Sequence, residues 1–73
     1  MSVKLVFPYN LKEQMQKKGM NAKQLANLLG TYESVVSTYL SGKTLPSLVT
    51  VHHISKILDC TLDDLCKGHR LGE

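Results

Sequence analysis

The chain has 73 residues, enough for one domain, and 42% of them are apolar, a fraction that suits a globular protein and is too high for a disordered one. No apolar run approaches the roughly 18 residues that a membrane span requires, and two cysteines cannot cross-link a small scaffold, so we expect a reduced, cytoplasmic protein away from the membrane. Because so short a chain has little room for a catalytic cleft beside its core, its size favours a binding module over an enzyme.

Positive charge is concentrated in the first part of the chain. The formal net charge is +3, and residues 1–45 contain six lysines against two glutamates, which gives them +4. Residues 46–73 contain three basic and four acidic residues, which gives them −1. A basic first part favours a surface that faces a polyanion, although a solvated surface of ordinary lysines has the same composition.

Residues 1–9 are predicted to form an extended arm or short strand. Val3, Leu5 and Phe7 alternate with other residues, and Pro8 ends the run. A lone strand has no partner in an otherwise helical chain, so we expect this apolar stripe to pair or pack across a two-fold axis with a second copy. The alternative is an arm that folds back over its own helices.

Five helices are predicted after this arm. Three starts carry capping boxes, in which one side chain accepts a backbone N–H and a second reaches back: Asn10 with Glu13, Asn21 with Gln24, and Thr61 with Asp64. A further cap is predicted at Ser47, and helix ends are predicted at Gly19, Gly30 and Gly42. The predicted helices cover residues 11–18, 22–29, 32–40, 48–58 and 62–67.

The second and third of these helices are joined by a very short turn. Helices so joined must cross steeply, as in a helix-turn-helix, and Ala26 is small where the two would approach closely. This geometry leaves the later helix of the pair with an outward polar face.

Residues 10–66 resemble the Cro/C1-type family of phage repressors, also called the XRE family of helix-turn-helix regulators. The matching positions are Gly19, Leu25, Ala26, Gly30, Val36, Ser37, Gly42, Pro46, Ser47, Leu48, Val51, Ile54, Leu58, Thr61 and Leu65. The resemblance implies an all-α, five-helix, lambda-repressor-like DNA-binding domain over residues 10–67, followed by a C-terminal tail over residues 68–73. It also implies that the third helix enters a major groove.

The chain departs from the family at four positions. The glutamine that begins the family's second helix is Ala22 here, and the serine cap of its third helix is Tyr32. An arginine and a glutamate that pair beneath the motif are replaced by Met15 and Leu40. Exchanging a buried ion pair as a whole for packed apolar side chains is tolerated, so we expect these two residues to touch and to be largely buried.

The family register assigns candidate DNA contacts. The residues expected to reach base edges are Tyr32, Glu33, Ser34, Ser37 and Thr38. The residues expected to contact phosphates, through an open helix N-terminus or the loop after the third helix, are Ala22, Lys23, Ser41, Lys43 and Thr44. The alternative is that these are ordinary solvated polar residues.

The histidines and cysteines do not have the spacing of a closed zinc site, so we predict no metal and no cofactor. The residues concerned are His52, His53, His69, Cys60 and Cys66. Cys60 occupies a position where the family has a small apolar core residue, and free cysteine packs as one.

The sequence thus predicts a regulator of transcription that binds double-stranded DNA and has no enzymatic role. We expect a repressor that occupies a palindromic operator as a homodimer. One alternative is an antitoxin-like protein that binds both DNA and a protein partner, such as a toxin or an anti-repressor. Another is a protein-interaction module that has lost base reading.

Overall fold

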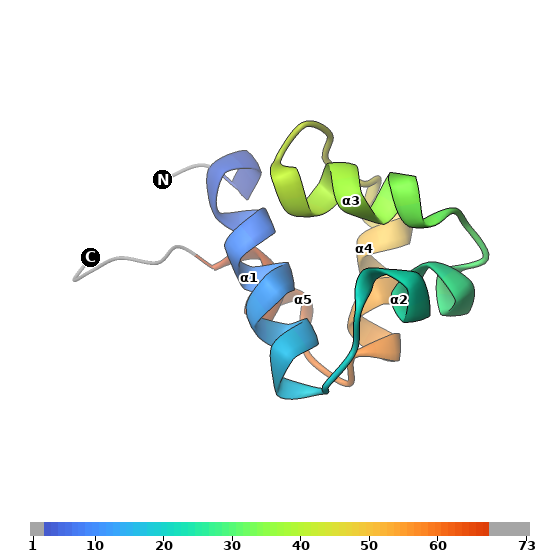
Figure 1. Ribbon diagram of the computed structural model, residues 1–73. Coiled ribbons are helices and arrows are strands. Elements are labelled where there is room, and N and C mark those ends of the chain that lie inside the picture. The colour runs from blue at the N-terminus through green and yellow to red at the C-terminus, as the bar shows by residue number, and fades with distance from the viewer. Residues whose placement is uncertain (1–2, 68–73) are drawn as a thin grey trace.

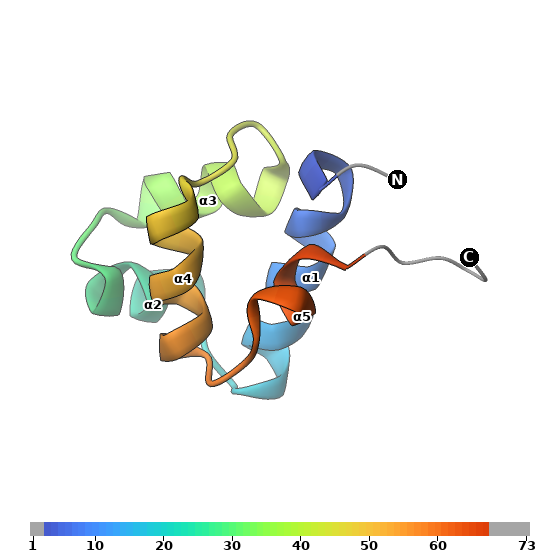
Figure 2. The ribbon, with the colours of Figure 1, turned by 180° about the vertical axis from the view of Figure 1, so that it is seen from behind.

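The structure, a computed structural model, describes the backbone of residues 3–67 and the side chains of residues 6–67, which form five α-helices (Figure 1). The helices are α1 (Val3–Lys17), α2 (Ala22–Leu29), α3 (Glu33–Ser41), α4 (Leu48–Ile57) and α5 (Leu62–Cys66). α2 packs on α3 and α4, whereas α1 packs on α3 and α5. Seen from behind, α4 and α5 close the other side of the bundle (Figure 2). The predicted all-α, five-helix fold is confirmed.

Local signals set the ends of α2, α4 and α5 much as the sequence indicates. Asn21 and Gln24 form a capping box at α2, Thr61 and Asp64 form one at α5, and Ser47 accepts the N–H of Thr50 at α4. The backbone N–H of Thr61 donates to the Asp64 carboxylate and so lowers the pKa of that group. α2 and α3 each end on a glycine in the left-handed conformation.

The prediction of an extended N-terminal arm is wrong. α1 begins at Val3 and continues through Pro8, so the expected boundary between residues 9 and 10 falls inside a helix. Phe7, Leu11 and Met15, four residues apart, form a buried stripe of this helix. Burial of that stripe outweighs the backbone hydrogen bond that proline cannot make.

The same helix removes Phe7 from any dimer contact. Its side chain is fully buried within its own chain, in the core cluster. A side chain covered in this way is not available to a second copy. Val3 and Leu5, the other two residues of the predicted dimer arm, belong to the part of α1 whose side chains lie outside the described residues, as does the predicted tail at 68–73.

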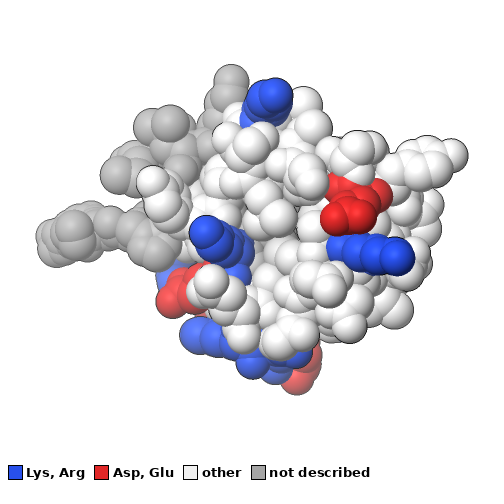
Figure 3. Space-filling view, in the orientation of Figure 1, with Lys and Arg blue, Asp and Glu red and all other residues white. Residues whose placement is uncertain are grey.

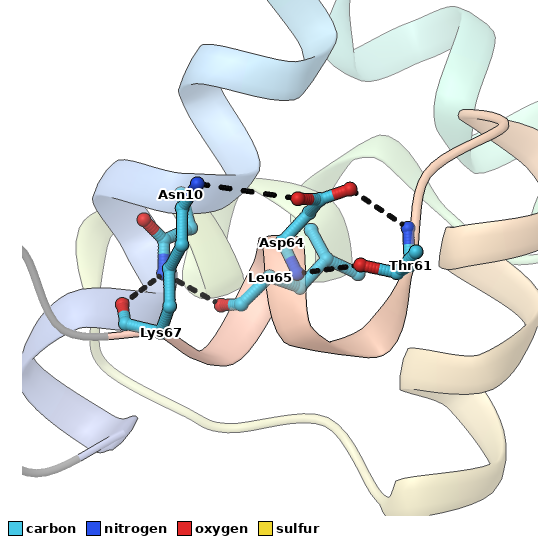
Figure 4. Close-up of polar contacts among 5 residues, drawn as sticks. All are labelled: Asn10, Thr61, Asp64, Leu65 and Lys67. Carbon is cyan, nitrogen blue, oxygen red and sulfur yellow. Dashed lines mark hydrogen bonds and ion pairs between the residues drawn. The ribbon is translucent and has the colours of Figure 1, made fainter.

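Asn10 is not a helix cap of α1, as the sequence suggested, but a buried link between α1 and α5. Its side-chain amide donates to the carbonyl oxygens of Leu65 at 2.9 Å and Lys67 at 2.8 Å (Figure 4). The last carbonyls of a helix have no partner inside it, so Asn10 supplies from α1 the cap that α5 lacks locally. A five-residue helix is too short to be stable alone and depends on such tertiary support.

Replacing Asn10 with alanine should therefore destabilise the protein by about 2 kcal/mol, because it leaves backbone acceptors buried without their donor. Urea unfolding followed by circular dichroism measures this loss. Asn27→Ala, at an exposed position of α2, is the control and should change stability by no more than about 0.5 kcal/mol. Equal stability of the two variants would contradict the capping role.

The rest of the core follows the predicted apolar spacing. Besides the α1 stripe, the buried apolar side chains are Val6, Leu25, Ala26, Val36, Val51, Ile54, Leu58 and Leu65. Cys60, predicted to be a small core residue, is half-buried and packs against this cluster, and burial raises the pKa of its thiol. Over the part of the chain that the structure describes, no helix is long and apolar enough to cross a bilayer.

Candidate nucleic-acid interface

The turn between α2 and α3 orients both helices. Gly30 ends α2, and the N–H groups of Gly30 and Thr31 both donate to the Ala26 carbonyl. Ala26 and Val36 are buried where the helices meet. α2 and α3 are thus packed together across a very short turn, as in the helix-turn-helix that the sequence predicted.

α3 presents an uninterrupted polar face to solvent. Glu33, Ser34, Ser37 and Ser41 are exposed and share one side of the helix, whereas Val36 is buried. Tyr32 precedes them and is 78% exposed. Four of the five predicted base-reading residues are thus exposed on or beside this face.

Thr38, the fifth predicted base-reading residue, is half-buried and bonded within the protein. Its hydroxyl donates to the Val35 carbonyl at 2.6 Å and lies 2.8 Å from the Thr44 hydroxyl. Its carbonyl accepts the Ser41 hydroxyl at 3.1 Å and the Lys43 backbone N–H at 3.0 Å. Thr38 therefore ties the loop after α3 back to the helix.

These contacts were not predicted, although the sequence carries a signal for them. Thr38, Ser41 and Thr44 are hydroxyl residues at intervals of three, which places them on one side of a helix end. We name these three residues the hydroxyl clasp. Hydroxyl side chains in such positions commonly bond the backbone of the preceding turn.

Backbone donors are open at the start of α2. The capping box uses the N–H groups of Asn21 and Gln24. The N–H groups of Ala22 and Lys23 lie between them and make none of the backbone hydrogen bonds described for residues 3–67. Lys23 is exposed and Ala22 half-buried. Two of the five predicted phosphate contacts therefore lie at an open helix terminus, which favours an anion.

A cavity of about 320 Å³ separates this terminus from α1. Its walls include Met15 and Leu40, the residues that replace the family's ion pair, together with Met20 and Ala22. Met15 is 4% exposed, as predicted, but Leu40 is only half-buried. The two therefore line the same cavity, whereas full burial holds for Met15 alone.

Basic groups do not cover the face shown in Figure 3 as one patch. Lysine side chains stand apart over most of it and gather along its lower edge, and carboxylates lie beside several of them (Figure 3). Glu33 is the only charged residue within α3. Electrostatic attraction to a polyanion would therefore depend on individual lysines, such as the exposed Lys23 and Lys43.

The histidines and cysteines remain dispersed. His52 and His53 are exposed neighbours on α4, with ring centroids 6.2 Å apart, and Cys66 is half-buried on α5. Within residues 3–67, no three histidine, cysteine or acidic residues gather where they could hold a metal ion. His69 lies outside the described residues.

Comparison with known proteins assigns this chain to a family. Residues 10–67 match the profile of the Cro/C1-type helix-turn-helix DNA-binding domain. A curated relative, the uncharacterized HTH-type transcriptional regulator YqaE of Bacillus subtilis (strain 168), is 35% identical over 63 residues, which are 86% of this chain and 54% of the relative. The chain thus spans about half the length of that relative.

Two solved structures have a similar fold. The restriction-modification controller protein C.AhdI from Aeromonas hydrophila is 30% identical with a TM-score of 0.75, and the match covers 81% of this chain and 86% of that one. The SOS-response transcriptional repressor LexA from Eubacterium rectale shares the fold at 20% identity and a TM-score of 0.84, over 94% of this chain and 73% of that one. The chain belongs to the family of Cro/C1-type helix-turn-helix DNA-binding domains.

Proposed function

We propose that this protein is a sequence-specific DNA-binding regulator of transcription that acts as a repressor by placing α3 in a major groove. The observation that carries the proposal is the uninterrupted polar face of α3 beside the open N-terminus of α2. In a helix-turn-helix, the second helix reads base edges while the terminus of the first holds a phosphate. Membership of a DNA-binding family supports the same assignment over that of an enzyme.

We further propose that two copies bind a palindromic operator, with half-sites about one helical turn apart, and block a promoter by occupying it. Phe7 cannot join the copies, because the core of its own chain covers it. The start of α4 offers apolar surface instead: Leu48 is 76% and Val49 65% exposed. Such side chains gain from being covered by a partner.

Selection of bound sequences from a random DNA pool at moderate salt tests this function. An enriched palindrome would support a sequence-specific dimer, and a single enriched half-site would support base reading by a monomer. Recovery of DNA without any enriched sequence would contradict the proposed function.

An antitoxin-like protein or a protein-interaction module is the second candidate, and two observations favour it. α3 has no basic residue, and the apolar side chains of Leu45, Leu48 and Val49 are exposed in the loop before α4 and at its start. Salt dependence separates DNA binding from a protein-interaction module. Affinity for DNA must fall steeply as ionic strength rises, whereas binding through an apolar protein contact should change little.

Lys43→Ala is expected to weaken binding to all DNA sequences alike and to reduce the slope of log affinity against log salt by about 1, because one phosphate contact is lost. Fluorescence anisotropy at several salt concentrations measures this slope. Lys56→Ala is the matched control, because Lys56 is an exposed lysine in the last turn of α4, at the far end of that helix from the loop. A Lys43 variant with an unchanged slope would remove Lys43 from the interface.

A further inference from the structure

In the hydroxyl clasp, it is fixed which group donates and which accepts in each hydrogen bond. Each hydroxyl carries a single proton, and that of Thr38 is donated to the Val35 carbonyl at 2.6 Å. The 2.8 Å contact between Thr38 and Thr44 must therefore use the proton of Thr44. Ser41 donates its own proton to the Thr38 carbonyl at 3.1 Å. All three protons are used inside the protein, and lone pairs are what remains for an external ligand.

Apart from the Lys43 ammonium, the surroundings of the clasp offer few donors to replace these protons. The backbone N–H groups of Lys43 and Thr44 both donate to the Thr38 carbonyl, at 3.0 and 3.4 Å. α3 contains no arginine, lysine, asparagine, glutamine or histidine, and Glu33 only accepts when ionised. The described residues of α3 thus lack the side chains that donate bidentately to guanine or grip adenine.

In the major groove, only the amino groups of adenine and cytosine donate hydrogen bonds, whereas guanine and thymine present acceptors there. Phosphate oxygens are acceptors too. Lone pairs on Thr38 and Thr44 are therefore matched to an amino group and mismatched to a keto oxygen or a phosphate.

From this polarity, and resting on the proposed function, we infer that the hydroxyl pair of Thr38 and Thr44 reads the exocyclic amino group of adenine or cytosine. Thr44 is then a specificity-determining residue and not the phosphate contact that its position in the family suggests. Thr38 both accepts from the base and positions Thr44, because its lone pair holds the Thr44 proton.

The experiment combines isosteric variants with DNA that lacks one amino group. Thr38→Val keeps the side-chain shape, removes the hydroxyl and releases the Thr44 proton. The base position that faces the clasp is the one whose preference changes between wild type and Thr38→Val in the sequence selection. At that position, adenine is then replaced by purine, or cytosine by 2-pyrimidinone, each of which lacks only the amino group.

Wild type should lose about fivefold in affinity on amino deletion, the value of one hydrogen bond, while Thr38→Val should lose almost nothing. Thr38→Ser, which restores the hydroxyl, should recover the sensitivity. Thr50→Val is the matched control, because it makes the same isosteric change on α4, outside the predicted DNA contacts, and it should respond to amino deletion as wild type does. Thermal melting of each variant verifies that it is folded.

Equal sensitivity of wild type and Thr38→Val to amino deletion, or a wild type indifferent to it, would overturn the inference while leaving sequence-specific binding intact. The proposed function fails separately, at the selection step, if wild type enriches no sequence; the inference then fails with it. A shift of Thr38→Val toward guanine or thymine at the same position would support the inference most directly, since a released Thr44 proton suits an acceptor.

Discussion

Phe7→Ala is expected to destabilise the protein by about 3–5 kcal/mol, the usual cost of deleting a buried aromatic side chain and leaving a cavity. Phe7 is fully buried and is the bulkiest of the fully buried side chains. A domain of this size is stabilised by only about 5 kcal/mol, so much of the variant should be unfolded at room temperature. Urea titration followed by circular dichroism gives the free energy of unfolding.

Tyr9→Ala is the matched control for Phe7→Ala, because Tyr9 is an aromatic residue of the same helix that is 71% exposed. We expect it to cost less than about 1 kcal/mol. If Phe7 instead served a dimer contact, its replacement would lower the mass in light scattering and leave the monomer's stability nearly unchanged. That result would contradict the helical placement of residues 3–9.

Met15→Arg is expected to cost about 3 kcal/mol or more, because it places an unpaired charge at a buried position. Met15 is 4% exposed and lines the same cavity as Leu40. Adding Leu40→Glu to Met15→Arg should recover part of the loss by giving the new charge a partner. The four proteins of this double-mutant cycle are compared by their free energies of unfolding.

Gln16→Arg is the control for the new charge, because Gln16 also lines the cavity but is exposed. It should change stability by less than about 0.5 kcal/mol. A double variant no more stable than the sum of its two single changes would show that residues 15 and 40 do not interact. That outcome would make the paired departure from the family a coincidence.

The helices after residue 20 were predictable because their signals are local. Asn21, Ser47 and Thr61 cap helices within three residues of themselves, and Gly30 and Gly42 end α2 and α3. No distant contact is needed to interpret such positions. The boundaries predicted there accordingly differ from the structure by at most one residue at each end.

The first helix was mispredicted because its decisive contacts are distant. The alternation up to Phe7 and the following Pro8 have the local features of a strand and its end, and Asn10 before Glu13 resembles a cap. Burial of Phe7 and Leu11, four residues apart on one face of the helix, outweighs the strand signal. The cap signal at Asn10 is overridden by its side-chain hydrogen bonds to Leu65 and Lys67, which lie 55 and 57 positions further along the chain.

The candidate DNA-binding site could likewise be predicted only in part from the sequence. Helical register alone places Ser34 and Ser37 on the outward face of α3. The hydroxyl partners of Thr38 depend on how the loop after Gly42 returns to the helix, and nothing in residue spacing fixes which proton is donated where. The sequence therefore predicts which side chains of α3 are exposed, but not which hydroxyl donates and which accepts.

The hydrogen bonds from Asn10 to the end of α5 join the first and last helices of the described fold. α1 and α5 lie side by side in both views (Figures 1 and 2). During synthesis on the ribosome, α1 emerges before the other four helices, yet the acceptors of the Asn10 amide lie at the end of α5 and just after it. The domain can therefore close only after residue 67 has left the exit tunnel, and α1 and α5 should gain protection from hydrogen exchange together as one cooperative unit.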